Sequence, residues 1–194
     1  MVKVYSCSFF LLFLGILCVI PVQAGKNKGN LSNLVCFVRF LDEDNDEMFE
    51  HPFSMYEQLF NDATSGANSV YNYFREASYG QLSWKSSFYP KAVDGKVISY
   101  RANRERGYYK PKGDINDIGY EDEVDKAARE QALIREVAAW LSDALPEDSP
   151  LDADGDGIVD NMCIVLSGRS DSVTSIYCGP TVPTWLCPMK RPYI

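Results

Sequence analysis

Hydrophobic and polar positions alternate along the chain in blocks that predict both strands and helices. Residues 34–41 (LVCFVRFL) are almost continuously apolar and β-favouring, which is typical of a buried strand. Residues 81–89 (QLSWKSSFY) alternate as a half-buried strand does, and 96–100 is expected to form a short strand. A further buried strand is predicted over 161–166 (NMCIVL).

Helical spacing of apolar residues predicts helices between these strands. Residues 54–61 are expected to form a short helix capped by Ser54, and Asn68 or Ser69 can cap a second one. The longest helix is predicted over about 121–145, with acidic residues in its first turn and Pro146 stopping it. Its expected apolar stripe consists of Val124, Ala128, Ile134, Val137, Ala138, Leu141 and Leu145. This order predicts one α/β (α+β) domain, with a mixed sheet and a long helix.

The N-terminus has the pattern of a secretory signal peptide. Lys3 precedes an apolar run over 7–22, and Val22-Gln23-Ala24 supplies the small residues of a cleavage site. The run is short and Pro21 interrupts its end, which argues against a membrane anchor. We therefore expect residues 1–24 to be removed and the protein to be secreted or periplasmic, without stable membrane insertion. Residues 25–32 are predicted to be a flexible lead-in.

Charge and cysteine content narrow the classes of partner. The formal net charge of −8 argues against nucleic acid, because nucleic-acid binding needs a basic surface. Basic residues in the middle of the chain are expected to form a solvated loop: Arg101, Arg104, Arg106, Lys110 and Lys112. Export permits disulfides, and the pairing of the cysteines outside the signal stays open: Cys36, Cys163, Cys178 and Cys187.

The stretch DADGDGIVD at 152–160 predicts a calcium site. Its carboxylates alternate as in the opening of an EF-hand loop, and Gly157 permits the turn that directs a carbonyl at the ion. The twelfth position is Cys163 instead of glutamate, so no EF-hand pair is implied, and a solvated acidic turn is the alternative. Such an oxygen-only site is structural and not catalytic. The candidate ligands are Asp152, Asp154, Asp156, the Ile158 carbonyl and Asp160.

Several stretches together resemble the secreted zinc metalloproteases of the immune inhibitor A type. They are LVCFVRF at 34–40, HPFSMYEQLFN at 51–61, SVYNYFREASYGQLSW at 69–84 and DADGDGIVDNMCIVLSG at 152–168. The resemblance covers residues 33–168 and implies the N-terminal part of a zincin-like catalytic domain. It also implies that the aspartate loop binds calcium.

The catalytic chemistry of that family depends on an H-E-x-x-H helix that holds zinc. This sequence contains one histidine, His51, which is expected to be a loop residue, and it contains no H-E-x-x-H. No zinc ligand or catalytic residue carries over. The resemblance implies a metalloprotease fragment that is inactive alone, whose intact relatives act on proteins or peptides. The alternative is a self-standing secreted, calcium-stabilised binding module.

The tail at 169–194 is dense in Pro, Cys and Trp and has no periodicity. It is either a disulfide-held terminal loop or a segment translated out of frame. The second hypothesis rests on Tyr177-Cys178 and the residues after it, because moving the codon boundaries one base earlier permits Leu-Trp-Pro-His, which resembles what the family carries there.

Two further groups of residues have alternative interpretations. Some aromatic residues could line a sugar-binding face, although their helical and strand spacing favours the core: Tyr71, Tyr73, Phe74, Tyr79 and Trp84. A serine nucleophile is not indicated, because neither Ser78 nor Ser167 lies in a G-x-S-x-G elbow.

Overall fold

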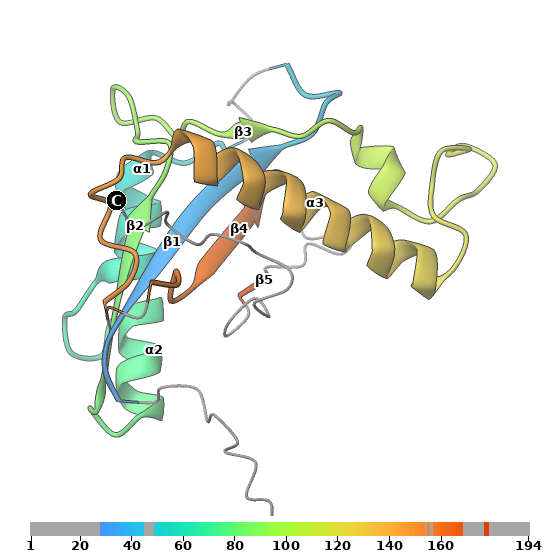
Figure 1. The fold of residues 1–194 in the computed structure, drawn as a ribbon. Helices are drawn as coiled ribbons and strands as arrows, with labels where there is room; N and C mark the ends of the chain where they lie inside the picture. The colour runs from blue at the N-terminus through green and yellow to red at the C-terminus, as the bar shows by residue number, and fades with distance from the viewer. Residues whose placement is uncertain (1–27, 45–48, 154, 156, 169–176, 179–194) are drawn as a thin grey trace, which may run out of the picture.

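The computed structural model describes residues 28–44, 49–153, 155, 157–168 and 177–178 (Figure 1). The predicted signal peptide, and the predicted tail apart from 177–178, lie outside the described residues. The described strands are β1 (Gly29–Arg39), β2 (Leu82–Phe88), β3 (Tyr100–Arg101), β4 (Met162–Leu166) and β5 (Tyr177–Cys178). The described helices are α1 (Phe53–Asn61), α2 (Val70–Ala77), the short 3-10 helix η2 (Arg106–Tyr109) and α3 (Glu123–Ala144).

These strands form one mixed sheet with β1 at its centre. The order is β2-β1-β4-β5, and β3 also pairs with β1. The first half of β1 lies parallel to β2 and its end lies parallel to β3, while its other edge pairs with β4, also in parallel. The last strand, β5, is antiparallel to β4. The predicted mixed sheet with one long helix is therefore confirmed at the level of an α/β architecture.

Alternate residues of β1 pack on opposite faces of the sheet and build two hydrophobic clusters. Leu34, Cys36 and Val38 are buried against α3, whereas Val35 and Phe37 are buried in the cluster that includes residues of α1. This period of two is the reason that an almost continuous apolar run suits a central strand covered on both faces. Figure 1 shows α3 crossing one face while α1 and α2 lie beside β2. Within the described part, no helix combines the length and apolar character needed to cross a membrane.

The buried face of α3 differs in part from the predicted stripe. Val137, Ala138 and Leu141 are buried as expected, and Leu133 joins them although the predicted stripe omits it. The prediction is wrong for Val124, which is 79% exposed, and for Ala128, which is also exposed. Figure 1 shows the start of α3 extending beyond the sheet, and neither residue belongs to a core cluster. Asp122 caps the helix by accepting a hydrogen bond from the Asp125 N–H at 2.8 Å.

The structure also corrects three local predictions. Strand β1 begins at Gly29, so most of the predicted lead-in at 25–32 that the structure describes pairs with β2 in the sheet. Ser54 does not cap α1, which follows Pro52 and has no side-chain cap. Ser69 does cap α2, accepting a hydrogen bond from Asn72 at 3.1 Å. The strand expected at 96–100 is reduced to Tyr100–Arg101, which pair with the end of β1.

The topology places two groups of polar residues at opposite edges of the sheet. The aspartate loop leads into the amino end of β4, beside the middle of β1. Glu43 and Ser167 follow the carboxyl ends of β1 and β4. Strands β1 and β4 are adjacent. From β1 the chain continues through α1 and α2 to β2, on one side of β1, and it later returns through α3 to β4, on the other side of β1. In open α/β sheets, such a change of direction at the carboxyl edge is where ligands commonly bind.

Candidate functional site

Hydrogen bonds within the aspartate loop close its ends and shape its turn. The Asp160 N–H donates to the Leu151 carbonyl at 3.0 Å, and Leu151 is buried. The Asp152 carboxylate accepts from the Gly155 N–H at 2.6 Å and from the Gly157 N–H at 2.8 Å. Both glycines have positive φ, 75° and 83°. A side chain would be strained in that conformation, so glycine is required for this turn.

The far end of the loop is tied to the sheet through Asp160. Its Oδ2 atom accepts a hydrogen bond from the Ser32 N–H of β1 at 2.8 Å. The next residue, Asn161, donates from Nδ2 to Asn33 Oδ1 at 2.6 Å, and Asn33 Nδ2 donates to Ser86 Oγ of β2 at 2.9 Å. A polar ladder of buried side chains therefore runs from the loop across β1 to β2. Because buried polar groups are costly unless they are paired, this ladder specifies how the loop sits on the sheet.

The two described carboxylates are chemically suited to a hard cation. Asp152 accepts a hydrogen bond on each oxygen, and Asp160 Oδ2 accepts a second bond from the Ala153 N–H at 2.9 Å. Oxygen donors are the ligands that calcium prefers. Asp152 and Asp160 are therefore of the chemical type that the predicted site requires.

The remaining candidate ligands are only partly described. Asp154 and Asp156 lie outside the described residues. Ile158 is described, and its side chain is partly exposed at the surface of the loop. Among the residues that the structure describes, no three His, Cys, Asp or Glu side chains are gathered as metal ligands. The predicted site of Asp152, Asp154, Asp156, Ile158 and Asp160 therefore stays a prediction.

His51 lies at the surface, directly before α1. It is exposed, and its ring centroid is 6.3 Å from that of Tyr56. This position agrees with the expectation of a loop residue.

A buried ion pair at the carboxyl edge of β1 and β4 was missed from the sequence. Arg106 donates from Nε to Glu43 Oε1 at 2.9 Å, and its Nη2 contacts the same oxygen. Nη2 also donates to the Ser167 carbonyl at 2.8 Å and to Ser167 Oγ at 3.0 Å. Glu43 is 7% exposed and Ser167 1%. The prediction that Arg106 belongs to a solvated loop is therefore wrong.

The second oxygen of Glu43 completes this network. Oε2 accepts hydrogen bonds from Ser167 Oγ and from the Phe40 N–H, the latter at 3.0 Å. The guanidinium of Arg106 lies over the Phe40 ring, 4.5 Å from its centroid. Gly168 has no room for a side chain, since a Cβ there would lie 2.7 Å from Arg106 Nη1. The network clamps the ends of both strands to η2, and its hydrogen-bonding groups are used within the protein.

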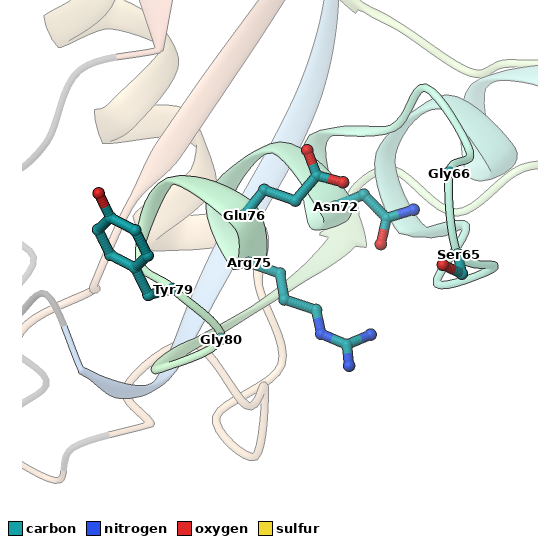
Figure 2. Close-up of a pocket in the computed structure, with 7 residues that line it drawn as sticks. All are labelled: Ser65, Gly66, Asn72, Arg75, Glu76, Tyr79 and Gly80. Atoms are coloured by element: carbon teal, nitrogen blue, oxygen red, sulfur yellow. The ribbon is translucent and has the colours of Figure 1, made fainter.

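A groove of about 330 Å³ runs along the exposed side of α2 (Figure 2). Asn72, Arg75, Glu76 and Tyr79 line it at helical spacing. The aromatic residues of this region divide into two groups. Trp84 is buried and stacks on Phe74 with centroids 4.0 Å apart, as expected of core residues. The core interpretation is wrong for Tyr73 and Tyr79, which are 66% and 91% exposed.

The described cysteines leave the predicted disulfide pairings open. Cys36 is a buried free thiol in the cluster under α3, and burial raises its pKa to about 12. Cys163 and Cys178 are Cα partners in the antiparallel register of β4 and β5. Cys187 lies outside the described residues.

Comparisons with protein-family models, with characterised proteins and with solved structures find no match to this chain. The functional argument therefore rests on the residues and their geometry.

Proposed function

We propose that the chain is the N-terminal part of a secreted, immune inhibitor A-like metallopeptidase domain of partial zincin-like fold, in which the loop at 152–160 binds calcium. The main support for this proposal is that the Asp160 carboxylate joins the loop to the sheet. It accepts hydrogen bonds from the Ser32 N–H of β1 and from the Ala153 N–H of the loop. A cation bound beside this carboxylate would stabilise the loop and the central strand together. The role of the metal is thus structural.

The electrostatics of the loop support this role. The sequence confines Asp152, Asp154, Asp156 and Asp160 to nine positions, and no basic residue lies among them. Carboxylates this close repel each other when ionised, and a divalent cation removes that repulsion. Ligand binding to the folded state alone stabilises it in proportion to the logarithm of ligand concentration. Calcium should therefore raise the stability of the domain.

The proposal assigns no catalytic residue to this chain. Two histidines one helical turn apart and the glutamate between them supply the zinc centre of such peptidases. The sequence offers only His51, which the structure places at the surface before α1. Zinc and protein or peptide substrates belong to the intact peptidase domain, and the present residues supply scaffold.

Calcium titration by isothermal calorimetry tests the proposal. We expect one calcium ion to bind the full chain, and the double variant Asp154→Ala, Asp156→Ala to lose this heat. The matched control is Asp143→Ala, an exposed acidic residue on α3 away from the loop. An absence of calcium binding to the parent chain would refute the proposal, as would equal binding by the double variant.

The second candidate is a self-standing, calcium-stabilised binding module. The groove on α2 favours it, because an exposed tyrosine lines a hollow together with Arg75 and Glu76, which form no ion pair with another described residue. Both candidates predict that the chain does not hydrolyse fluorescein-casein when zinc and calcium are present. Hydrolysis that rises with the concentration of the chain would contradict the assignment of no catalytic residue.

A further inference from the structure

The residues that line the groove on α2 come from the loop before the helix, from the helix and from the turn after it. Asn72, Arg75, Glu76 and Tyr79 recur every three or four residues, so they form one stripe along the helix and just beyond it. Figure 2 shows Ser65 and Gly66 beyond Asn72 at one end and Tyr79 at the other. The lining residues therefore run from the loop at 65–66, along α2, to the turn that ends the helix.

Tyr79 occupies a conformation that packing does not explain. Its φ is 56°, in the left-handed region where glycine is usual, and Gly80 follows with φ 76°. The Tyr79 N–H donates to the Glu76 carbonyl at 3.0 Å and the Gly80 N–H to the Arg75 carbonyl at 2.6 Å, which holds the turn. The ring is nevertheless 91% exposed. Strained backbone of this kind occurs at binding sites as well as at helix ends, and here it presents the ring to solvent.

Asn72 supplies an acceptor at the other end. The residue is 5% exposed, and its Nδ2 donates to the Thr64 carbonyl at 2.6 Å and to the Ala67 carbonyl at 3.0 Å. These two bonds fix the amide plane. Among the described residues none donates to Asn72 Oδ1, and this atom is not one of the buried polar atoms, so it is accessible as an acceptor on the wall of the groove.

Between these ends lie two charged side chains of opposite sign. Arg75 and Glu76 are exposed, and neither forms an ion pair with another described residue. Their charges cancel, so the groove has no net preference for an anion or a cation. Together they offer several hydrogen-bond donors and acceptors.

We infer that this groove binds a short neutral oligosaccharide. The flat face of Tyr79 suits the C–H face of a sugar ring, while Glu76, Arg75 and Asn72 suit the hydroxyl groups of its neighbour. A volume of about 330 Å³ is at the small end of natural ligand pockets. This inference goes beyond the calcium proposal and does not depend on it.

The test is a titration of the full, isotope-labelled chain with maltotriose, cellotriose and chitotriose, followed by amide NMR. We expect at least one trisaccharide to shift the signals of residues 65–66 and 72–80. The variant Tyr79→Asn should weaken that binding at least about tenfold, since asparagine tolerates the left-handed conformation but lacks the ring. The control Tyr73→Ala removes another exposed tyrosine of α2 that does not line the groove, and it should change binding less than about twofold.

Three outcomes would overturn the inference. One is that no trisaccharide shifts these signals at about 10 mM, a concentration at which even weak binding is visible. Another is that Tyr79→Asn binds as the parent does. The last is that tri-alanine shifts the same signals as strongly, which would assign the groove to peptides. Calcium binding measured on the same sample separates a failure here from a failure of the calcium proposal.

Discussion

Replacing Arg106 by methionine would leave the Glu43 carboxylate buried without its cation. Glu43 is 7% exposed, and the lost bonds are those from Nε and Nη2 to Oε1 and from Nη2 to Ser167. Breaking a buried pair in this way typically costs about 3–5 kcal/mol. The Arg106 side chain is 26% exposed, and Glu43 keeps its bonds from Ser167 and Phe40, so we expect about 3 kcal/mol.

Urea unfolding followed by tryptophan fluorescence measures this effect. The set consists of Arg106→Met, Glu43→Gln and the double variant, which together form a thermodynamic cycle. The double variant should be less destabilised than the sum of the single variants, with a coupling of at least about 1.5 kcal/mol. Arg101→Met is the control, because the ion pair of Arg101 with Asp44 is exposed and 3.8 Å long. It should cost less than about 1 kcal/mol. A coupling below about 0.5 kcal/mol would refute the buried clamp.

The remaining predictions concern the core, a helix cap and alkaline pH. Leu141→Ala should destabilise by about 2–5 kcal/mol in the same urea assay, since Leu141 is fully buried on the face of α3 that packs on the sheet. Ser69→Ala should cost about 1 kcal/mol through loss of the cap on Asn72, and a change below about 0.2 kcal/mol would contradict it. Burial raises the Cys36 pKa from 9.0 to about 12, so the unfolded chain loses this proton at lower pH than the folded one. The contribution of the protonated Cys36 thiol to the free energy of unfolding should therefore be fully present below pH 9 and be lost as pH rises toward 12. Between pH 9 and 10, the free energy of unfolding should fall less steeply in Cys36→Ala than in the parent.

Local pattern was sufficient for the central elements of the fold. The apolar run at 34–41 predicted β1 because both faces of that strand are covered, and helical spacing placed α3 to within two residues at its start. The local pattern failed where strand pairing or burial depends on residues far away in the sequence. Residues 29–33, which are polar or glycine apart from Leu31, belong to β1 because β2 lies beside them, and the apolar Val124 stays exposed because the sheet does not reach it.

The polar sites show the same division. The aspartate loop is local, so its spacing and glycines predicted a closed turn before β4. Glu43 and Arg106 are 63 residues apart, and no spacing rule connects them. Tyr79 follows α2 at a helical interval that suggests burial, but the chain has already turned left-handed there and its ring points outward. Only the fold separates it from the core residue Trp84.

The most direct test of the calcium proposal is the melting temperature of the full chain with calcium and with a chelator. The proposal predicts that calcium raises the melting temperature of the parent and slows exchange of the Ser32 and Ala153 amides, which donate to Asp160. It also predicts no rise in the Asp154→Ala, Asp156→Ala variant. A parent chain that melts at the same temperature with calcium and with the chelator would contradict it.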